Sequence, residues 1–537
     1  MALISWDSAF RAAFATVVAY LIHFIIKLFR HRRQMMGLPG PPYHPILGHL
    51  PVAIEMARSL PPDVHPHHYW AWLKKRYNLG PFYYFDAWPM GPPTLIICEP
   101  EVADHVTVKH NLDKHPMVKQ YLKQHLGTDN MAAANGIVWK RARTVYNPGF
   151  ATSHLMTVIA SIVDDVVTLS EVLGEAADSS EVIQLETVAM KLSFDVIGRL
   201  VLGVSLGSQR KSNVLVDAFR RQLHFLSSSN TWASPLAGVN PLQQFSIWRN
   251  ARVIDGYLGR ELDERFAKQD ESETTARPRT IIDVALRTYN EDRGTTAANM
   301  RTMDAAFRRS AIDQIKTFVF AGHDTISTTI SMLFYYLSTA PHAVSTLRAE
   351  LSTTFPPTTA ETAARIRADP YILNSLPYAT ACIKETLRLF PPANTVRIGS
   401  PSVHITDPGT GATYPTLPRP GTVVWPDAYV LGRDDAYFPR ATEFLPERWL
   451  PESPVAQAPV GAWRPFERGP RNCIGSEFGV MEVKVVVALC AREFEFEAVW
   501  PEGVADVDGE RCYQMLFGSA KPKGGVPGRM KRMGRNG

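Results

Sequence analysis

The sequence predicts a mainly α-helical protein with small β-sheets and one transmembrane helix at its N-terminus. Three observations support this fold class. Residues 12–29 are almost wholly apolar, and two short alternating apolar stretches follow within the first hundred residues. Beyond these stretches, apolar residues recur at helical spacing along most of the 537-residue chain, so helices should form the bulk of the molecule.

The composition indicates a globular protein with a large core. Hydrophobic residues make up 45% of the chain, and 41 prolines are spread along it. The formal net charge of +5 is small for this length, which argues against a nucleic-acid-binding protein. The five cysteines are widely spaced and form no CxxC pair, as expected for reduced thiols facing cytosol. No repeat or long spacer divides residues 46–520, which we expect to form one catalytic domain.

The N-terminal apolar stretch is predicted to be a membrane anchor. Residues 12–29 approach the length that crosses a bilayer as a helix. Arg30-His31-Arg32-Arg33 follow directly and outweigh Arg11 on the other side, so residues 1–11 should be lumenal and the rest cytosolic. A cleaved signal peptide is the alternative interpretation, but its positive charge should precede the apolar core.

The segments after the anchor are predicted from proline content and periodicity. Residues 30–45, which include Leu38-Pro39-Gly40-Pro41-Pro42, should form a stiff basic hinge. A strand pair is expected at residues 82–85 and 94–98. Long helices are expected near residues 139–150, 152–173, 181–204, 211–227, 248–269, 304–339, 341–354, 376–390 and 473–491.

Three further segments are predicted to lack regular structure. Residues 227–241 are either a loop that covers a pocket or touches lipid, or an ordinary helix connector. Residues 268–279 look like an exposed polar connection. Residues 521–537 carry six basic residues and no acid amid glycine and proline, which is typical of a disordered tail.

One cysteine lies in a chemically distinctive setting. Residues 465–475 read Pro-Phe-Glu-Arg-Gly-Pro-Arg-Asn-Cys-Ile-Gly, and an apolar helix is expected to follow. Cys473 at the start of that helix, with Arg471 nearby, should have a lowered thiol pKa that favours metal ligation. Gly469 and Gly475 would let the backbone approach a flat ligand. A lone cysteine at a helix start is usually structural. The residues around Cys473 are what favour a functional role for it.

A long apolar segment at residues 317–337 carries polar residues near its middle. His323, Asp324 and Thr325 would be costly in lipid, so we prefer a helix buried in protein to a second membrane span. Gly322 would weaken the helix where Thr325 could open its hydrogen bonding.

Other polar residues at helical spacing are candidate supports of a site. Glu385 and Arg388 share one helix face, and Arg448 lies in the downstream run Pro446-Glu447-Arg448-Trp449. Trp139 and Arg143 lie four residues apart at a helix start, and Arg397 follows a double proline.

These motifs resemble, in the same order, those of the cytochromes P-450. The loop at Cys473 resembles their cysteine-loop signature, and residues 321–325 resemble their oxygen-binding motif. The resemblance implies the cytochrome P-450 fold, with Cys473 as the axial ligand of a haem b iron. It further implies that Asp324 and Thr325 are catalytic and guide protons to O2. The residues implied to bind the cofactor are Cys473, Phe466, Arg471, Trp139, Arg143 and Arg397, and a structural network is implied for Glu385, Arg388 and Arg448.

The implied activity is that of a haem-thiolate monooxygenase. A thiolate ligand donates electron density to iron and favours cleavage of the O–O bond. No flavin or nicotinamide domain is recognisable in the 62 residues 476–537. NADPH-derived electrons are therefore expected through a separate NADPH-cytochrome P-450 reductase, with cytochrome b5 as an additional donor. The implied location is the endoplasmic reticulum membrane, with a single span and a cytosolic catalytic domain.

The substrate can be narrowed only to a class. Pro470, Trp449 and His323 most resemble filamentous-fungal microsomal members, which favours an apolar terpenoid or polyketide intermediate of secondary metabolism. Phe318, Phe320 and Ile326 would wall the distal space with hydrocarbon. Loops at residues 110–135, 205–245 and 393–400 would shape the pocket. The alternatives are a fatty-acid hydroxylase, a haem-thiolate isomerase or dehydratase that uses no O2, and a non-catalytic haem sensor.

Overall fold

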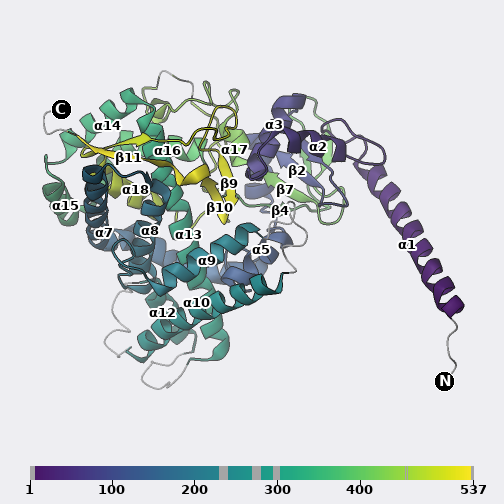
Figure 1. Cartoon of the computed structure of the whole chain (residues 1–537), viewed down its shortest axis with the longest axis horizontal. Helices are drawn as coiled ribbons and strands as arrows, with labels where there is room; N and C mark the ends of the chain where they lie inside the picture. Colours follow the sequence, from purple (N-terminus) through teal and green to yellow (C-terminus); the bar gives the residue numbers. More distant parts are fainter. Residues whose placement is uncertain are drawn as a thin grey trace.

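The computed structural model describes residues 6–228, 240–268, 280–293, 303–453, 455 and 457–533. The part of the chain that it describes is mainly helical, as expected, with small sheets. One long helix, α1, projects away from the body, and the N-terminal sheet lies on the side from which α1 leaves (Figure 1).

Helices form most of the body and pack around the buried helix α13. The helices of the first half are α1 (Trp6–Met35), α2 (Leu50–Ser59), α3 (Pro66–Tyr77), α4 (Pro100–Asp104), α5 (Pro116–Leu126), α6 (Gly136–Tyr146), α7 (Thr152–Ser179), α8 (Leu185–Leu202), α9 (Val214–Ser228) and α10 (Pro241–Ala267). Those of the second half are α12 (Ile281–Arg293), α13 (Ala305–Ser338), α14 (Pro341–Thr354), α15 (Thr359–Ala368), α16 (Pro377–Leu389), α17 (Ala428–Gly432) and α18 (Ser476–Cys490). Each of the long helices predicted from periodicity is present, although α10 begins at Pro241 and not at 248, and α7 ends at Ser179 and not at 173.

Four small sheets accompany the helices. A mixed sheet has the order β1-β2-β7-β4 and a three-stranded sheet the order β3-β11-β8, while β5 pairs with β6 and β9 with β10. The predicted strand pair is confirmed, because β1 and β2 are antiparallel neighbours. The strands are β1 (Phe82–Phe85), β2 (Thr94–Ile97), β3 (Ile183–Gln184), β4 (Arg397–Ile398), β5 (His404–Thr406), β6 (Thr413–Pro415), β7 (Val423–Pro426), β8 (Phe494–Ala498), β9 (Gln514–Phe517), β10 (Ser519–Pro522) and β11 (Pro527–Arg532).

Helices α8 and α13 pack closely at Gly322. A Cβ atom added there would lie 2.6 Å from the side chain of Ile197 on α8. The glycine is therefore explained by helix packing, and α13 runs unbroken through this position. The expectation that Gly322 opens the helix at Thr325 is wrong.

The N-terminal helix is longer than the predicted anchor. Within α1, Phe10–Met35 is long and apolar enough to cross a membrane, by length and composition. The helix continues to Met35, so the first residues of the predicted hinge, 30–35, are helical and not part of a flexible joint. The proline-rich part of the hinge follows only after this helix ends.

The C-terminal end of α1 is fixed to the N-terminal sheet by a buried ion cluster. Asp86, just after β1, accepts hydrogen bonds from Arg32 and from the Tyr43 hydroxyl, and its other oxygen lies 2.7 Å from His31 Nε2. Arg32 also donates to the carbonyls of Ile46 and Trp88. His31 and Arg32 are thus turned into the protein, and only their neighbours in the basic run remain exposed.

The predicted disordered tail is wrong for most of its length. Lys521 lies in β10, and Pro527–Arg532 forms β11 between β3 and β8. The basic residues of β11 alternate with buried Gly528 and Met530, which anchor the strand to the core. The predictions for residues 229–239 and 269–279 lie outside the described residues.

Candidate functional site

The loop before α18 holds Cys473 in a fixed conformation. The Cys473 amide donates to the Phe466 carbonyl at 2.8 Å, and the Phe466 ring packs edge-on against Trp463. Gly469 has φ +82°, and a Cβ there would lie 2.6 Å from the Thr107 carbonyl oxygen. Gly469 is therefore needed for close contact with the backbone of Thr107, and its predicted contact with a flat ligand stays a prediction.

The electrostatics of Cys473 differ from the prediction. Helix α18 begins at Ser476 with Gly475 as its N-cap, so the cysteine precedes the helix. Cys473 is exposed, but protein atoms packed around the loop desolvate its thiol and raise the thiol pKa. The Gly475 amide and the charges of Arg143 and Lys114 offset only part of this effect. The prediction that the helix start and Arg471 give a net lowering of the Cys473 pKa is wrong. A bound cation would be needed to favour the thiolate form.

Helix α13 offers an uncovered stretch within an otherwise buried helix. Residues 311–319 and 326–334 are buried, whereas Ala321 is exposed and Thr325 partly so. These two residues lie on one face, and Thr325 Oγ1 donates to the Ala321 carbonyl at 2.8 Å. Helix α18 contacts the same helix where Gly479 approaches Ile326.

The apolar side chains expected to wall this space have different surroundings. Phe318 is buried between Tyr146 and Phe150, with ring centroids 5.0 and 5.2 Å away. It belongs to the core between α13 and α6. Phe320 is half-buried and packs against the small cluster that contains Leu122, so the expectation of a shared wall is wrong for Phe318.

Cationic side chains gather around the cysteine loop. Arg397 is fully buried, yet its Nε and Nη2 atoms have no hydrogen-bond partner among the described residues. Burial, together with the charges of Arg397 and Arg471, lowers the pKa of Lys114 to about 7. Burial likewise lowers the pKa of Arg397 to about 10, despite the opposing charge of Glu467. Such a cluster is costly without added negative charge.

The other expected cofactor-binding residues are arranged around the same loop. Arg143 donates both of its Nη groups to Asn472, at 2.7 and 2.8 Å. Arg471 pairs with Asp113 at 2.8 Å, and its guanidinium lies 4.4 Å from the ring centroid of Trp139. The structure therefore brings Trp139, Arg143, Arg397 and Arg471 together with Cys473.

Asp324 is buried, and its carboxylate contacts residues of β10. Its carboxylate accepts a hydrogen bond from the Ser519 amide at 2.9 Å and lies 3.0 Å from the Lys521 ammonium. Among the described residues, the Asp324 carboxylate makes no hydrogen bond with the Thr325 hydroxyl, which donates to the Ala321 carbonyl. The two expected catalytic residues are adjacent in sequence, but their side chains are engaged separately.

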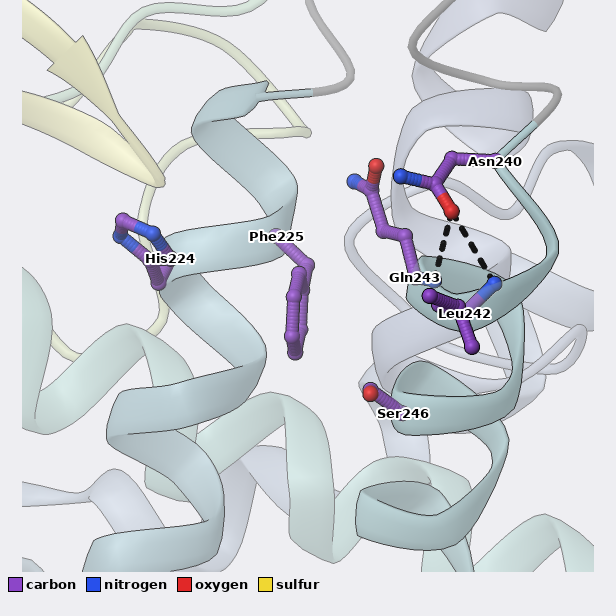
Figure 2. Close-up of a pocket in the computed structure, with 6 residues that line it drawn as sticks. All are labelled: His224, Phe225, Asn240, Leu242, Gln243 and Ser246. Carbon is purple, nitrogen blue, oxygen red and sulfur yellow. Dashed lines mark hydrogen bonds between the residues drawn. The ribbon is translucent and has the colours of Figure 1, made fainter.

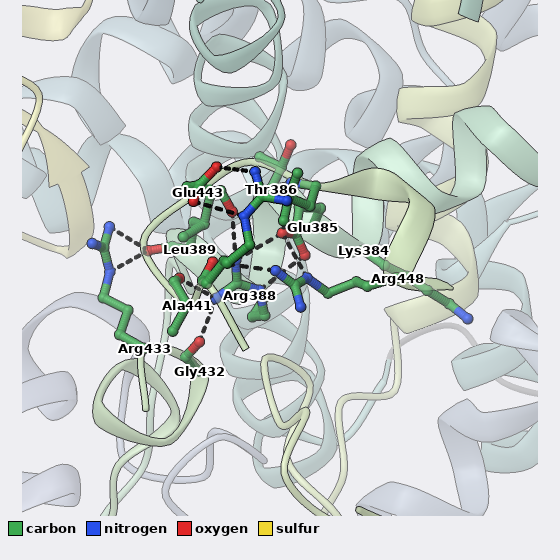
Figure 3. Close-up of polar contacts among 12 residues, drawn as sticks. Lys384, Glu385, Thr386, Arg388, Leu389, Gly432, Arg433, Ala441, Glu443 and Arg448 are labelled. Carbon is green, nitrogen blue, oxygen red and sulfur yellow. Dashed lines mark hydrogen bonds and ion pairs between the residues drawn. The ribbon is translucent and has the colours of Figure 1, made fainter. Parts of the chain in front are cut away.

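Glu385, Arg388 and Arg448 form one buried network (Figure 3). Glu385 accepts two hydrogen bonds from Arg388 at 2.7 and 2.9 Å and one from Arg448 at 3.0 Å. The Trp449 indole and the Leu445 amide donate to the same carboxylate. Arg388 also donates to the carbonyls of Ala441 and Glu443, so the network ties α16 to the segment that leads to the cysteine loop.

Two surface pockets lie beside α9 in the described part of the chain. One, of about 360 Å³, lies between α9 and α10 and is lined by His224, Phe225, Asn240, Leu242, Gln243 and Ser246 (Figure 2). Asn240 caps α10 by accepting from the Leu242 and Gln243 amides. The other, of about 550 Å³, lies between the start of α8, α9 and Phe517. Both are lined in part by residues of the 205–245 region, which is expected to shape the substrate pocket.

Comparison with known proteins decides the family. The family model "Cytochrome P450" matches residues 38–521. The chain belongs to the cytochrome P450 family. It is 33% identical to the cytochrome P450 monooxygenase acrF of Aspergillus aculeatus, over 88% of this chain and 99% of that protein. It is also 33% identical to the cytochrome P450 monooxygenase polC of Polytolypa hystricis, over 96% of this chain and 94% of the relative. A third relative, ptmG of Penicillium ochrochloron, is 25% identical.

This cytochrome P450 is thus an oxidoreductase of the monooxygenase type, and its family uses haem iron, O2 and a redox partner. The residues present fit a haem. The exposed Cys473 would supply the thiolate ligand, and the unpartnered nitrogens of buried Arg397 and Arg471 would suit anionic propionates.

Sequence reasoning missed several residues that this P450 places at the site. Lys114 joins the cations through a β-bridge between its backbone and that of Arg397, a long-range pairing without a local signal. Asn472 binds Arg143, and its position beside Cys473 could have drawn attention to it. For Lys521, the basic and glycine-rich composition of residues 521–537 predicts a tail, and the strand around it is too short to leave a clear pattern in the sequence.

Proposed function

We propose that this cytochrome P450 binds haem b through Cys473 and inserts one oxygen atom from O2 into an apolar organic substrate. One observation carries the proposal. An accessible cysteine and the accessible Ala321–Thr325 face of α13 lie within otherwise buried surroundings, beside buried Arg397 and Arg471, which have guanidinium nitrogens without a hydrogen-bond partner among the described residues. A haem-sized anionic ligand would satisfy all three features.

The side chains of the chain have separate tasks in this proposal. A bound haem supplies the reductive activation of O2 when electrons and protons are delivered. Cys473 holds the cofactor, and Phe466 fixes the backbone that presents the thiol. The cofactor is oriented by charge and hydrogen bonds from five side chains, those of Arg397, Lys114, Arg471, Trp139 and Arg143. Asp324 and Thr325 supply protons on the α13 side, where buried neighbours exclude bulk water.

The proposed electron source is NADPH, through a separate cytochrome P-450 reductase and with cytochrome b5 as a further donor. The proposed location is the endoplasmic reticulum membrane, with α1 as its single span and the catalytic domain in the cytosol. The apolar residues of α1 support this proposal, because Phe14, Ile22 and Phe29 are all exposed. Retention of the protein in membranes after alkaline extraction, and its release when residues 1–29 are deleted, would test it.

The proposed substrate is a terpenoid or polyketide intermediate of fungal secondary metabolism. The similarity to monooxygenases of three fungi supports this class. Fatty-acid hydroxylation is the second candidate. Substrate-induced spectral shifts with matched panels of terpenoids, polyketides and fatty acids distinguish them, since binding confined to fatty acids would overturn the first choice.

The ligand is tested by the carbon monoxide difference spectrum of reduced membranes. We expect the red-shifted Soret band of thiolate ligation in the wild type and its loss in Cys473→Ala. Cys490→Ala is the matched control, because Cys490 is buried in α18. The proposal is wrong if Cys473→Ala keeps the band. Turnover that needs neither NADPH nor O2 would instead identify a haem-thiolate isomerase or dehydratase. The absence of turnover with any substrate would identify a haem sensor.

A further inference from the structure

Glu482 is a buried acid in α18 for which the proposed mechanism has no task. Its side chain is completely buried, and apart from Lys484 every other residue from Met481 to Cys490 of this helix is apolar. Lys484 donates to the Leu373 carbonyl at 3.0 Å, and in the described part of the chain it forms no ion pair with Glu482. The acid therefore lies in an apolar interior without a counter-charge from its own helix.

The hydrogen bonding around Glu482 suits a neutral carboxyl group. Ser193 of α8 donates to its Oε1 atom at 2.8 Å, and its Oε2 atom has no partner among the described residues. An ionised carboxylate accepts hydrogen bonds at both oxygens, and burying it without a cation is costly in free energy. A protonated carboxyl leaves one hydroxyl without an acceptor, which costs much less. The geometry therefore favours the protonated form.

The charges on the neighbouring elements favour the same form. Helix α18 packs against α7, α13, α15 and α16. Burial, together with the charge of Asp165 on α7, raises the pKa of Glu482 to about 8 against the hydrogen bond from Ser193. Asp165 pairs with Arg199 of α8 at 2.6 Å, and Asp195 of α8 lies close enough to act on Asp165. Within the described residues, α13, α15 and α16 present no titratable group that shifts the Glu482 pKa. Glu482 is therefore uncharged at neutral pH.

Helix α18 connects Glu482 to the cysteine loop. The helix begins at Ser476, three residues after Cys473, and Glu482 lies six residues farther along it. Between them, Gly479 is in contact with the Ile326 side chain of α13. Close-packed interiors transmit strain, so a displacement of α18 at Glu482 reaches the backbone that presents Cys473.

We propose that Glu482 is a neutral acid that positions α18 and, through it, Cys473, and that its ionisation sets the alkaline limit of thiolate ligation. When Glu482 loses its proton to the solvent, an unpaired charge lies between α18 and α8. Water must then reach the carboxylate, so α18 moves away from Ser193 and the cysteine loop moves with it. Acidification returns the proton and reverses the change. Glu482 acts through Cys473 and is a positioning residue.

The inference rests on the proposed function and is tested in the holoenzyme by the carbon monoxide difference spectrum as a function of pH. We expect the wild type to lose the red-shifted Soret band at a midpoint near the pKa of Glu482, about 8. Glu482→Gln is neutral and of similar shape, so it should keep the band to a pH higher by about one unit or more. Glu495→Gln is the matched control with a wild-type midpoint, because Glu495 is exposed and follows the end of α18.

Ser193→Ala separates titration of Glu482 from simple structural support. The hydrogen bond from Ser193 lowers the Glu482 pKa, so removing it should raise that pKa and keep the Soret band to higher pH. A purely structural hydrogen bond would have the opposite effect, with loss of the band at lower pH. A wild-type midpoint in Glu482→Gln, or a lowered midpoint in Ser193→Ala, would overturn the inference.

A further readout does not depend on haem ligation. The pKa of a glutamate in an unfolded chain is about 4.3, so the stability that Glu482 contributes falls as the pH rises above this value and levels off above about 8. The Tm of the wild type relative to Glu482→Gln should therefore decrease between about pH 5 and pH 8 and then stay constant. A Tm difference that is independent of pH would overturn the inference. A wild type without the Soret band at any pH would instead refute the proposed function, and the Tm comparison would still decide whether Glu482 is neutral.

Discussion

At the scale of single residues, Arg397 shows how this protein prepares for an anionic ligand. It is buried at the start of β4, with one long hydrogen bond of 3.4 Å to the Leu112 carbonyl and an ion pair of 4.0 Å to Glu467. A buried guanidinium with so few acceptors is costly in free energy. That cost is recovered when an anion binds, so Arg397 contributes to affinity more than to folding.

Arg397→Met should therefore weaken haem retention. Hydrogen bonds to charged groups contribute about 1.5–3 kcal/mol, so we expect haem loss to accelerate by about tenfold or more. Transfer of haem to excess apomyoglobin measures the rate. Arg397→Lys keeps the charge, so its rate of haem loss should rise less. Wild-type rates of haem loss in both variants would contradict the proposed contact of Arg397 with a haem propionate.

The residues of the site differ in how far sequence could predict them. Cys473, Glu385 and Trp139 lie in local motifs whose spacing is visible in the chain. Lys521 and Glu186 are 335 residues apart, and no local pattern links them. The prediction of a lowered Cys473 pKa failed for a related reason, because desolvation depends on the packing of distant segments.

At the scale of elements, the cysteine loop depends on contacts with a helix far away in sequence. Gly469 lies against the backbone of Thr107 and Val108. Arg464 and Arg468 bind Asp104 in the same region. These contacts hold the loop in shape, and the close approach to the Thr107 carbonyl explains why residue 469 is glycine.

Gly469→Ala should disrupt this element. A left-handed φ costs a non-glycine residue roughly 1–2 kcal/mol, and the added Cβ would overlap the Thr107 carbonyl. We expect a lower Tm and a reduced yield of thiolate-ligated haem. Gly475→Ala is the matched control in the same loop, since its φ is −92° and its Cβ would lie 3.9 Å from the nearest atom, in Phe150. Equal losses in both variants would contradict this explanation.

The helices were predictable to within a few residues, because burial on one face leaves a period in the sequence. The helices that were missed have at most 13 residues, so their patterns span few turns; they are α2, α3, α4, α5, α12, α15 and α17. The tail was mispredicted because β11 is held by pairing with β8 and β3, and a composition rule does not detect such partners.

At the scale of the whole molecule, the cluster around Asp86 joins the helix α1 to the catalytic domain. Burial would raise the pKa of Asp86, but the contacts with His31, Tyr43 and Arg32 outweigh it and lower the pKa to about 2. Its pKa in an unfolded chain is about 3.9. The carboxylate therefore stabilises the fold fully above about pH 4, and this contribution is lost as the pH falls toward 2.

Asp86→Asn should lower the free energy of unfolding by about 3 kcal/mol or more at neutral pH, because Arg32 is left buried and unpaired. The difference in Tm from the wild type should stay constant above about pH 5 and shrink at lower pH. Asp508→Asn is the control, since its pair with Lys75 is exposed and contributes little. A Tm difference that grows on acidification would contradict the assignment.

The same joint gives α1 the mechanics of a lever arm. Its 30 residues make a rod of about 45 Å, and Gly48 leaves just enough room for Arg32 to fasten its inner end. A spanning helix changes its inclination with the thickness of the bilayer. Because the Asp86 cluster fixes the helix to the catalytic domain, such a change would rotate the domain with it. The bilayer thickness would then set the angle between the enzyme and the membrane surface.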